Sequence, residues 1–417
     1  MLRLIAKSIL NRRVAVALTV ASIALSVTLL LGVERLRAGT RAAFAGTISG
    51  TDLVVGARSG TVQLLLYSVF RIGNPTNNVS WKSYQELKQL SQVAWTIPLS
   101  LGDSHRGFRV LGTSQEYFRH YRFGFGRELA FAAGRPFEDL YDAVLGADVA
   151  GELGYVLNQE IVVAHGTGEV SFLDHGDKPF RVVGILGKTG TPVDRTVHVS
   201  LAGIEAMHAD WFAGAPVPAA KLTAEQTREQ DLTPKTLTAF LVGLHSKSAI
   251  FHVQRYINEY RAEALVAALP GAALQELWDL LSLPERALLA ISALVACVGL
   301  AGMATALLAG LNERRREMAV LRSVGAQPRH VFFLLMGEAG LLTLAGATLG
   351  VGLLYGILWL LQPVIEANFG LFIPIGLPSA YEFGLLSAIV AGGFLLGAWP
   401  AYRAYRMSVA DGVTVRV

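Results

Sequence analysis

The sequence has little charge and almost no cysteine. Charged residues make up 16% of its 417 positions, whereas a soluble protein of this length carries about a quarter. Apolar residues replace them in runs of about 20 residues or more, which is the length that crosses a bilayer. We therefore expect an integral membrane protein. Because Cys297 is the only cysteine, no disulfide can form within the chain, and any water-exposed domain must be stabilised by its own core.

Positive charge is scarce outside the middle of the chain, and what there is lies in three short segments. Between Glu34 and Arg286 there are 24 Lys and Arg residues against 26 Asp and Glu. All 12 remaining Lys and Arg lie in residues 1–13, 312–330 or 403–417, and none lies in 362–382. Short basic segments beside apolar runs are a topology signal, so we expect a membrane protein with no nucleic-acid partner.

Four apolar runs predict four transmembrane helices, at residues 14–33, 287–311, 331–361 and 383–402. The first run is also compatible with a cleaved signal peptide. However, its uncharged core exceeds the usual length of about 7 to 15 residues and is followed by charged residues from Glu34 onward, which favours a retained helix. By the positive-inside rule, we expect the three basic segments in the cytoplasm, and residues 34–286 and 362–382 outside.

The segment 34–286 has no run long enough to span a membrane, and its patterns predict a large α+β domain of two lobes. Strand patterns occur at residues 53–55, 106–113, 143–146, 159–166, 180–187, 195–200 and 236–244. Residues 250–269 have the pattern of a helix, and 274–283 that of a second helix that ends before Pro284. The polar residues 222–234 are expected to form a flexible connector.

The stretch 312–330, NERRREMAVLRSVGAQPRH, predicts a short helix, a turn and the start of the next helix. Met318, Leu321 and Val324 can share one side of the short helix. Gly325 suits its C-terminal cap, and Pro328 suits the first turn of the helix that follows. The arginines alone could be explained by membrane topology. Topology does not require the apolar row of Met318, Leu321 and Val324, so this row favours docking to a partner.

Two other motifs have a structural and a functional interpretation. Glu338 is an acid near the start of the third span, where a functional role, proton coupling included, competes with pairing to a basic residue or a helix end; we favour pairing. Residues 184–190, GILGKTG, contain Gly-Lys-Thr. A phosphate-binding loop needs a glycine five residues before Gly187, where Val182 stands, so we interpret the segment as a glycine-rich turn between strands.

Eight of the nine histidines fall in the segment 34–286: His105, His120, His165, His175, His198, His208, His245 and His252. No two have the spacing of a helix-borne metal site, and no cysteine assists them. We expect surface histidines, no metal site and no catalytic triad. Small residues recur at Gly346 and Gly350, Gly352 and Gly356, and Gly393 and Gly397. This spacing allows close contact between helices, within one chain or between two copies.

The stretch from Asn312 to Val331 resembles the signature of the MacB/FtsX-like permeases, the membrane subunits of type VII ABC transporters. The matching residues are Arg314, Glu317, Met318, Leu321, Arg322, Gly325 and Ala326. PAYRAYRMSVADGV, residues 400–413, resembles the tail of the family, with Ser408–Val409 where a proline is usual and Gly412–Val413 where Ala-Leu is usual. VLGADVAGELGY and FRVVGILGKTGTPVDRTVHVSLAGIEAM resemble the family's periplasmic sabre lobe.

The resemblance implies an architecture and a set of partners. It implies a porter-like lobe at about 38–115 and 236–283 and a sabre-like lobe at about 116–235. It also implies a homodimer, formed mainly through the first two spans. A separate ATP-binding subunit would dock on residues 312–330, Arg329 included, and its movement would pass up the second span. This chain would then be a non-catalytic permease without a cofactor, and ATP and Mg would belong to the partner.

Three functions fit the resemblance. The first is a permease that exports or extracts a hydrophobic, peptidic or lipoprotein-type substrate, with an adaptor or binding protein in the periplasm as a further partner. The second is an FtsX-like mechanotransmitter that regulates a periplasmic partner without transport, and the third is a sensor for a histidine kinase. The large outer segment favours the first. The expected location is the bacterial inner membrane, with both termini in the cytoplasm and the large domain in the periplasm.

Overall fold

The computed structural model describes residues 13–124, 126–165, 178–212, 215–216, 222–313, 320, 323–369, 373 and 375–406. The chain forms two compact units. A helix unit comprises residues 1–39, 282–363 and 373–417, and a sheet unit comprises residues 40–281 and 364–372.

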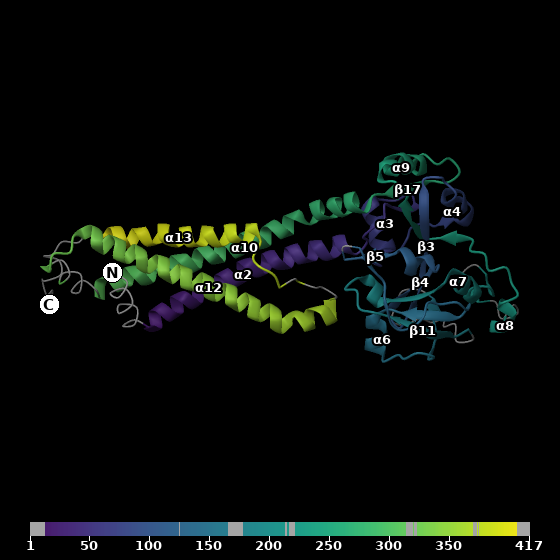
Figure 1. Cartoon of the computed structure of the whole chain (residues 1–417), viewed down its shortest axis with the longest axis horizontal. Coiled ribbons are helices and arrows are strands. Elements are labelled where there is room, and N and C mark those ends of the chain that lie inside the picture. Colours follow the sequence, from purple (N-terminus) through teal and green to yellow (C-terminus); the bar gives the residue numbers. More distant parts are fainter. Residues whose placement is uncertain are drawn as a thin grey trace. The chain divides into compact units, whose positions relative to one another are not determined.

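Four long helices run side by side in the helix unit (Figure 1). They are α2 (Arg13–Gly46), α10 (Pro270–Glu313), α12 (Pro328–Phe369) and α13 (Ala380–Tyr405). Each is long and apolar enough to cross a membrane, as predicted. Large apolar side chains on their outer surfaces, such as Leu25, Trp359 and Leu395, are exposed, which suits a lipid environment better than water.

α10 continues through Pro284, so the predicted helix end before this proline is wrong. Proline removes one backbone hydrogen bond and commonly ends a helix. Proline is tolerated in helices that enter a membrane where side chains, neighbouring helices or small backbone adjustments satisfy the carbonyl that it leaves free. One unbroken helix therefore runs from Pro270 to Glu313.

Two of the three predicted glycine pairs make close helix contacts within the chain. A Cβ on Gly350 would lie 2.6 Å from the Ala24 oxygen of α2, and the Thr28 hydroxyl donates a hydrogen bond of 2.9 Å to the Gly350 oxygen. A Cβ on Gly397 of α13 would lie 2.4 Å from the Ala339 Cβ of α12. Around Gly352 and Gly356, no atom of the described residues lies within 4 Å of such a Cβ.

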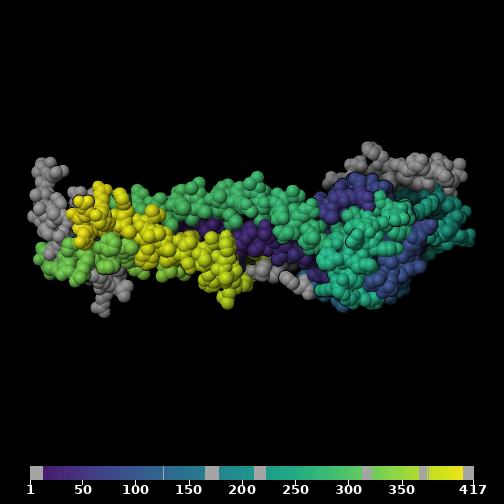
Figure 2. Space-filling model, turned by 90° about the horizontal axis from the view of Figure 1, so that it is seen from above, coloured from purple at the N-terminus to yellow at the C-terminus, as the bar shows by residue number. Residues whose placement is uncertain are grey.

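One face of the helix unit is formed largely by α13, drawn in yellow beside the green α10 in Figure 2. The two helices touch where Gly392 of α13 meets Leu300 of α10, at 3.2 Å from a Cβ built on the glycine. At another point a hydroxyl of α12, that of Thr343, lies 3.4 Å from the Met303 sulfur of α10. In each contact a small residue, Gly392 or Thr343, lets a larger side chain of α10 approach closely, as expected for helices that pack in lipid.

The sheet unit is built on one mixed sheet in the order β17–β1–β16–β3–β4–β12–β8–β11–β7, with β10 beside β3 and β9 beside β11. Its strands are β1 (Leu53–Ala57), β3 (Val93–His105), β4 (Phe108–Thr113), β7 (Phe131–Gly134), β8 (Asp142–Leu145), β9 (Glu160–Ile161), β10 (Ala164–His165), β11 (Phe180–Leu186), β12 (Thr196–Ser200), β16 (Ala239–Leu244) and β17 (Leu265–Ala268). Three two-stranded pieces join β2 (Val79–Ser80) to β15 (Thr236–Leu237), β5 (Arg122–Phe123) to β6 (Arg127–Glu128), and β13 (Trp211–Phe212) to β14 (Ala215–Pro216).

Short helices flank this sheet. They are α3 (Thr61–Ser68), α4 (Trp81–Lys88), α5 (Glu116–His120), α6 (Ala147–Leu153), α7 (Leu201–Met207), α8 (Ala224–Thr227) and α9 (Ile250–Asn258), with 3-10 turns η1 (Pro192–Arg195) and η3 (Lys247–Ala249). Val110 and Leu111, neighbours on β4, belong to different buried clusters because side chains alternate between the faces of a strand. Both faces of the sheet are therefore covered at its centre.

The mixed α/β domain between the first two membrane helices agrees with the prediction, and most predicted strands are present. β4 pairs in parallel with β12, so the segments predicted as porter-like and sabre-like share one sheet. The predicted helix at 250–269 is wrong in its second half, because α9 ends at Asn258 and β17 pairs with β1. The predicted connector contains α8, which begins with a capping box between Thr223 and Gln226.

Candidate functional site

The predicted docking surface is described only in part. Arg314, Glu317, Met318, Leu321 and Arg322 lie outside the described residues. The structure describes Val320 and the chain from Ser323 onward, which includes Gly325, Ala326 and Arg329. The docking role of the whole set stays a prediction.

The described end of this stretch forms the predicted turn. Val324 N donates to the Val320 oxygen at 3.2 Å, and the Ser323 hydroxyl donates to the same oxygen at 2.8 Å. Gly325 follows with φ of +100°, which a side chain would disfavour. α12 then begins at Pro328, where the missing N–H costs nothing.

The turn presents apolar and basic side chains together. Val320 is 58% exposed and Val324 is 84% exposed, while Arg329 at the start of α12 is also exposed. Isolated exposed valines are ordinary, but two of them in a stretch that also exposes Arg329 supply the apolar and basic groups that a docking partner can cover. Val324 is the only member of the predicted apolar row within the described residues.

Both ends of the turn are held by a buried cluster. Leu311 of α10, Val331 and Leu335 of α12, and Ala401 and Ala404 of α13 pack together. Packed residues of three helices therefore flank the turn.

Glu338 lies on α12 with 2% of its surface exposed, and it has an interaction partner. The adjacent Ala339 is in close contact with Gly397 of α13, which places Glu338 in a tightly packed part of the helix unit. The pairing favoured from the sequence requires such a partner. Its role stays a prediction.

A buried polar cluster that the sequence analysis missed joins α2, α12 and α13. Arg35 Nε donates to Glu382 Oε1 at 2.8 Å, and Arg35 Nη2 donates to the Tyr355 hydroxyl at 2.7 Å and to the Gly376 oxygen at 3.0 Å. The guanidinium also lies 4.7 Å from the centre of the Tyr355 ring. Glu382 caps α13 by accepting from Ser379 N at 2.6 Å. The Ser-x-x-Glu spacing of Ser379 and Glu382 was a usable signal for the cap, but nothing in the sequence indicated Arg35 as its partner.

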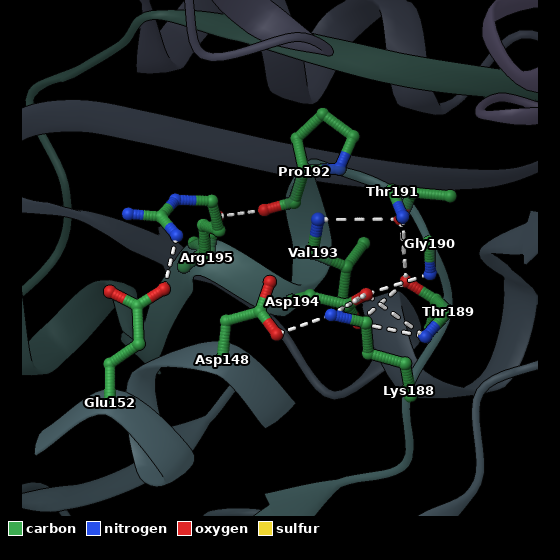
Figure 3. Close-up of polar contacts among 11 residues, drawn as sticks. Asp148, Glu152, Lys188, Thr189, Gly190, Thr191, Pro192, Val193, Asp194 and Arg195 are labelled. Carbon is green, nitrogen blue, oxygen red and sulfur yellow. Dashed lines mark hydrogen bonds and ion pairs between the residues drawn. The ribbon is translucent and has the colours of Figure 1, made fainter. Parts of the chain in front are cut away.

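The Gly-Lys-Thr segment is a loop between β11 and η1, as predicted (Figure 3). Thr189 N donates to both carboxylate oxygens of Asp194, at 2.8 and 3.1 Å, and Gly190 N donates at 2.7 Å. Lys188 pairs with Asp148. The backbone donors that a phosphate-binding loop offers to phosphate are thus used by an internal carboxylate. Burial raises the pKa of Asp194, although these hydrogen bonds act in the opposite direction.

Two histidines correct the expectation of surface residues. The His105 ring nitrogens lie 2.7 Å from the Val162 oxygen and 2.8 Å from the Tyr155 hydroxyl, and burial lowers its pKa. His198 is fully buried on β12, and burial, together with the positive charge of Arg71, lowers its pKa to about 3. Among the described residues, no group of three or more His, Cys, Asp and Glu side chains could hold a metal ion.

Comparisons with known proteins cover most of the chain. Residues 16–260 match the family model of the MacB-like periplasmic core domain, and residues 289–409 match that of the FtsX-like permease C-terminal region. The macrolide export ATP-binding/permease protein MacB of Photorhabdus laumondii is 32% identical over 116 residues, which are 28% of this chain and 17% of that protein. The match thus spans less than a fifth of the relative.

Two solved structures have low similarity. The periplasmic region of MacB from Actinobacillus actinomycetemcomitans is 11% identical, with a TM-score of 0.33 over 56% of this chain and 95% of that one. The extracellular domain of the noncanonic ABC-type transporter YknZ from Gram-positive bacteria is 14% identical, with a TM-score of 0.31 over 52% of this chain and 98% of that one.

Proposed function

This chain belongs to the MacB/FtsX-like family of ABC transporter permeases, and on that premise we propose that it couples ATP hydrolysis in a separate ATP-binding subunit to motion of its sheet unit. The output of that motion is the export or extraction of a hydrophobic, peptidic or lipoprotein-type substrate. The observation that carries this proposal is α10, a single helix of 44 residues that ends at the predicted docking stretch.

α10 is suited to transmit movement along its length. At 1.5 Å per residue a helix of this size is about 66 Å long. Its described C-terminal part is packed against α12 and α13 through the cluster at Leu311, so a displaced turn cannot move without the helix. Its N-terminal residues, from Pro270 to Leu281, belong to the sheet unit. Residues of this one helix therefore belong to both units.

The charge distribution supports the proposed location and partners. We place the chain in the bacterial inner membrane with both termini in the cytoplasm, because every Lys and Arg outside residues 34–286 lies in segments 1–13, 312–330 and 403–417. ATP and Mg belong to the ATP-binding subunit, and no cofactor is proposed for this chain. A second copy of the chain completes the assembly, and exposed apolar side chains on α2 and α10, such as Leu25 and Leu294, are available for that contact.

The docking step is tested with a double variant, Leu321→Asp with Arg322→Glu. The substitutions place acids in the predicted apolar row and at its central arginine, so we expect the ATP-binding subunit to be lost from the purified complex at least tenfold while membrane insertion is unchanged. Copurification of the tagged permease with its ATPase measures this, and the mass of the wild-type complex gives the copy number. Arg255→Glu, an exposed charge reversal on α9, is the matched control and should retain the ATPase.

Transport and mechanotransmission are separated by a second readout of the same complex. If the chain is a permease, deletion abolishes movement of a substrate while ATPase activity responds to that substrate. If it is a mechanotransmitter, no substrate moves and ATPase activity responds to a periplasmic partner protein. Retained copurification of the double variant would contradict the docking proposal for both functions.

A further inference from the structure

The sheet unit contains an open cavity of about 420 Å³. Its apolar wall is formed by Phe44, Phe70, Ile72, Phe108 and Pro192. Three arginines also line it, namely Arg71, Arg109 and Arg195. This volume is within the range of sites that hold small organic molecules. An apolar wall with a few charged groups is the usual composition of such a site.

One of the three arginines is already neutralised. Arg195 pairs with Glu152, and its guanidinium lies 4.9 Å from the centre of the Phe108 ring. Asp148, which also lines the cavity, pairs with Lys188 (Figure 3). The acids on this side of the cavity are therefore engaged by other cations and do not compensate Arg71 or Arg109.

Arg71 and Arg109 leave an excess of positive charge. Among the described residues no carboxylate pairs with either. Within the described ranges, Arg109 donates to two neutral oxygens, those of Asn74 at 3.1 Å and Gly73 at 3.0 Å. The Nε and Nη1 atoms of Arg71 are buried and make no hydrogen bond of normal geometry in the described part of the chain, and the Tyr117 hydroxyl, which is close enough to interact with the Arg71 charge, is likewise buried without such a bond. A buried donor without a partner costs free energy, more so on a charged group, so these two atoms indicate an acceptor that binds from outside the chain.

The surroundings show the effect of this charge. Burial lowers the pKa of Arg109, and the positive charge of Arg71 lowers it further. The nearby phenol cannot supply the compensating negative charge, because burial raises the pKa of Tyr117 to about 12. Arg71 also has a positive φ of 61°, a conformation that side chains other than glycine rarely adopt. Such backbone strain is typical of binding sites.

We propose that this cavity binds a small amphiphile with one anionic head, a carboxylate or a phosphate, held by Arg71 and Arg109, and an apolar body held by Phe44, Phe70 and Phe108. The site is a property of the sheet unit and does not depend on ATP coupling. The head supplies acceptors for the two partnerless donors of Arg71, and the apolar walls exclude a bare inorganic anion as the preferred ligand. Such a head is found on lipids and on free organic acids.

The test uses the full-length chain in nanodiscs of zwitterionic lipid and 2-naphthoate as the probe. Calorimetric titration, with empty nanodiscs as the blank, should show 2-naphthoate binding at least tenfold more tightly than neutral 2-naphthalenemethanol and than inorganic phosphate. The affinity for 2-naphthoate should fall as NaCl is raised, whereas that for the alcohol should not. If a short-chain lysophosphatidate displaces 2-naphthoate, the natural ligand is a lipid. If it does not, the natural ligand is a free organic acid.

Variants decide whether the named arginines hold the head. Arg71→Met should weaken 2-naphthoate at least tenfold and leave 2-naphthalenemethanol unchanged. If Arg71→Met fails to fold, Arg109→Met, at a half-buried residue, should likewise weaken the binding of 2-naphthoate. Arg255→Met, an exposed arginine that does not line the cavity, is the control. Equal affinity for acid and alcohol, or wild-type affinity in a folded Arg71→Met or Arg109→Met chain, would overturn the proposal.

Discussion

The buried side chain of His198 makes the stability of the sheet unit depend on pH. Its ring lies 5.1 Å from that of Tyr117 between centroids, and its Nδ1 is 3.3 Å from the Val144 oxygen. With a pKa of about 3 in the folded chain and about 6.5 in the unfolded chain, the unfolded chain binds the proton more readily. The stabilising effect of the neutral ring is complete above pH 6.5 and is lost as the pH falls from 6.5 toward 3.

We expect His198→Phe to remove this dependence. One proton taken up on unfolding changes the free energy by about 1.4 kcal/mol per pH unit, so the wild type should lose about 2 kcal/mol more than the variant between pH 6.5 and 5. Hydrogen exchange of the β8 and β12 amides at pH 7.5, 6.5 and 5 measures the difference. His252→Phe, on the surface of α9, should keep the wild-type slope, and an identical slope in His198→Phe would contradict the prediction.

The sequence could not identify His198 as buried, for a local reason. In the stretch Thr196–Ser200, alternation suggests that polar side chains face water. β12 lies in the interior of the sheet with helices or loops over both faces, so every position from Thr196 to Val199 is buried. Burial on both faces removes the period-two pattern that a surface strand shows. The local sequence could not indicate the role of Arg71 either, because that role depends on which residues surround it in the fold.

Among the elements, α2 and α13 are joined by an ion pair that takes two charges out of solvent. Arg35 is 8% exposed and Glu382 is 4% exposed. In such a pair the attraction is largely offset by desolvation, but removal of one partner leaves the other buried and uncompensated. The pair therefore fixes which parts of the two helices face each other more than it adds stability.

We expect Glu382→Gln to destabilise the helix unit by about 3 kcal/mol, because Gln preserves the acceptor for Ser379 N while leaving Arg35 without a counter-charge. The double variant Arg35→Met with Glu382→Gln should lose less unfolding free energy than the two single variants lose together. Thermal unfolding of the wild type, the two single variants and the double variant in detergent measures these losses. Arg255→Met, which removes an exposed ion pair with Glu259, should cost at most about 1 kcal/mol. Additive single effects would show that the pair is not coupled.

Predictability differed between elements for physical reasons. Gly325 and Pro328 marked a helix boundary correctly, because each has a backbone property that few other residues share. β3 was not recognised, since Pro98 and Gly102 interrupt its pattern although it pairs on both sides near the centre of the sheet. β17 was mistaken for helix, because its alanines and leucine are good helix formers and only pairing with β1 makes it a strand.

At the scale of the whole molecule, the four membrane helices and the mixed domain between the first two were predictable, since run length and charge placement are properties of the chain. The cavity at Arg71 was not, because its walls come from segments that only the sheet brings together, among them Phe70, Phe108 and Pro192. The family resemblance predicts that residues 312–330 dock an ATP-binding subunit, and the described turn exposes side chains in the second half of that stretch.

The remaining prediction is the orientation of the chain in the membrane. In a Cys297→Ser background, Arg255→Cys and Gln327→Cys each provide a single exposed thiol, one in the segment 34–286 and one in the basic stretch 312–330. Because Lys and Arg concentrate on the cytoplasmic side, a membrane-impermeant maleimide added to spheroplasts should label Arg255→Cys at once and Gln327→Cys only after lysis. Native Cys297 lies within the apolar part of α10 and should react slowly in both conditions, since a membrane-impermeant reagent does not enter the apolar part of the bilayer. Labelling of Gln327→Cys before lysis would reverse the topology and, with it, the side from which an ATP-binding subunit must dock.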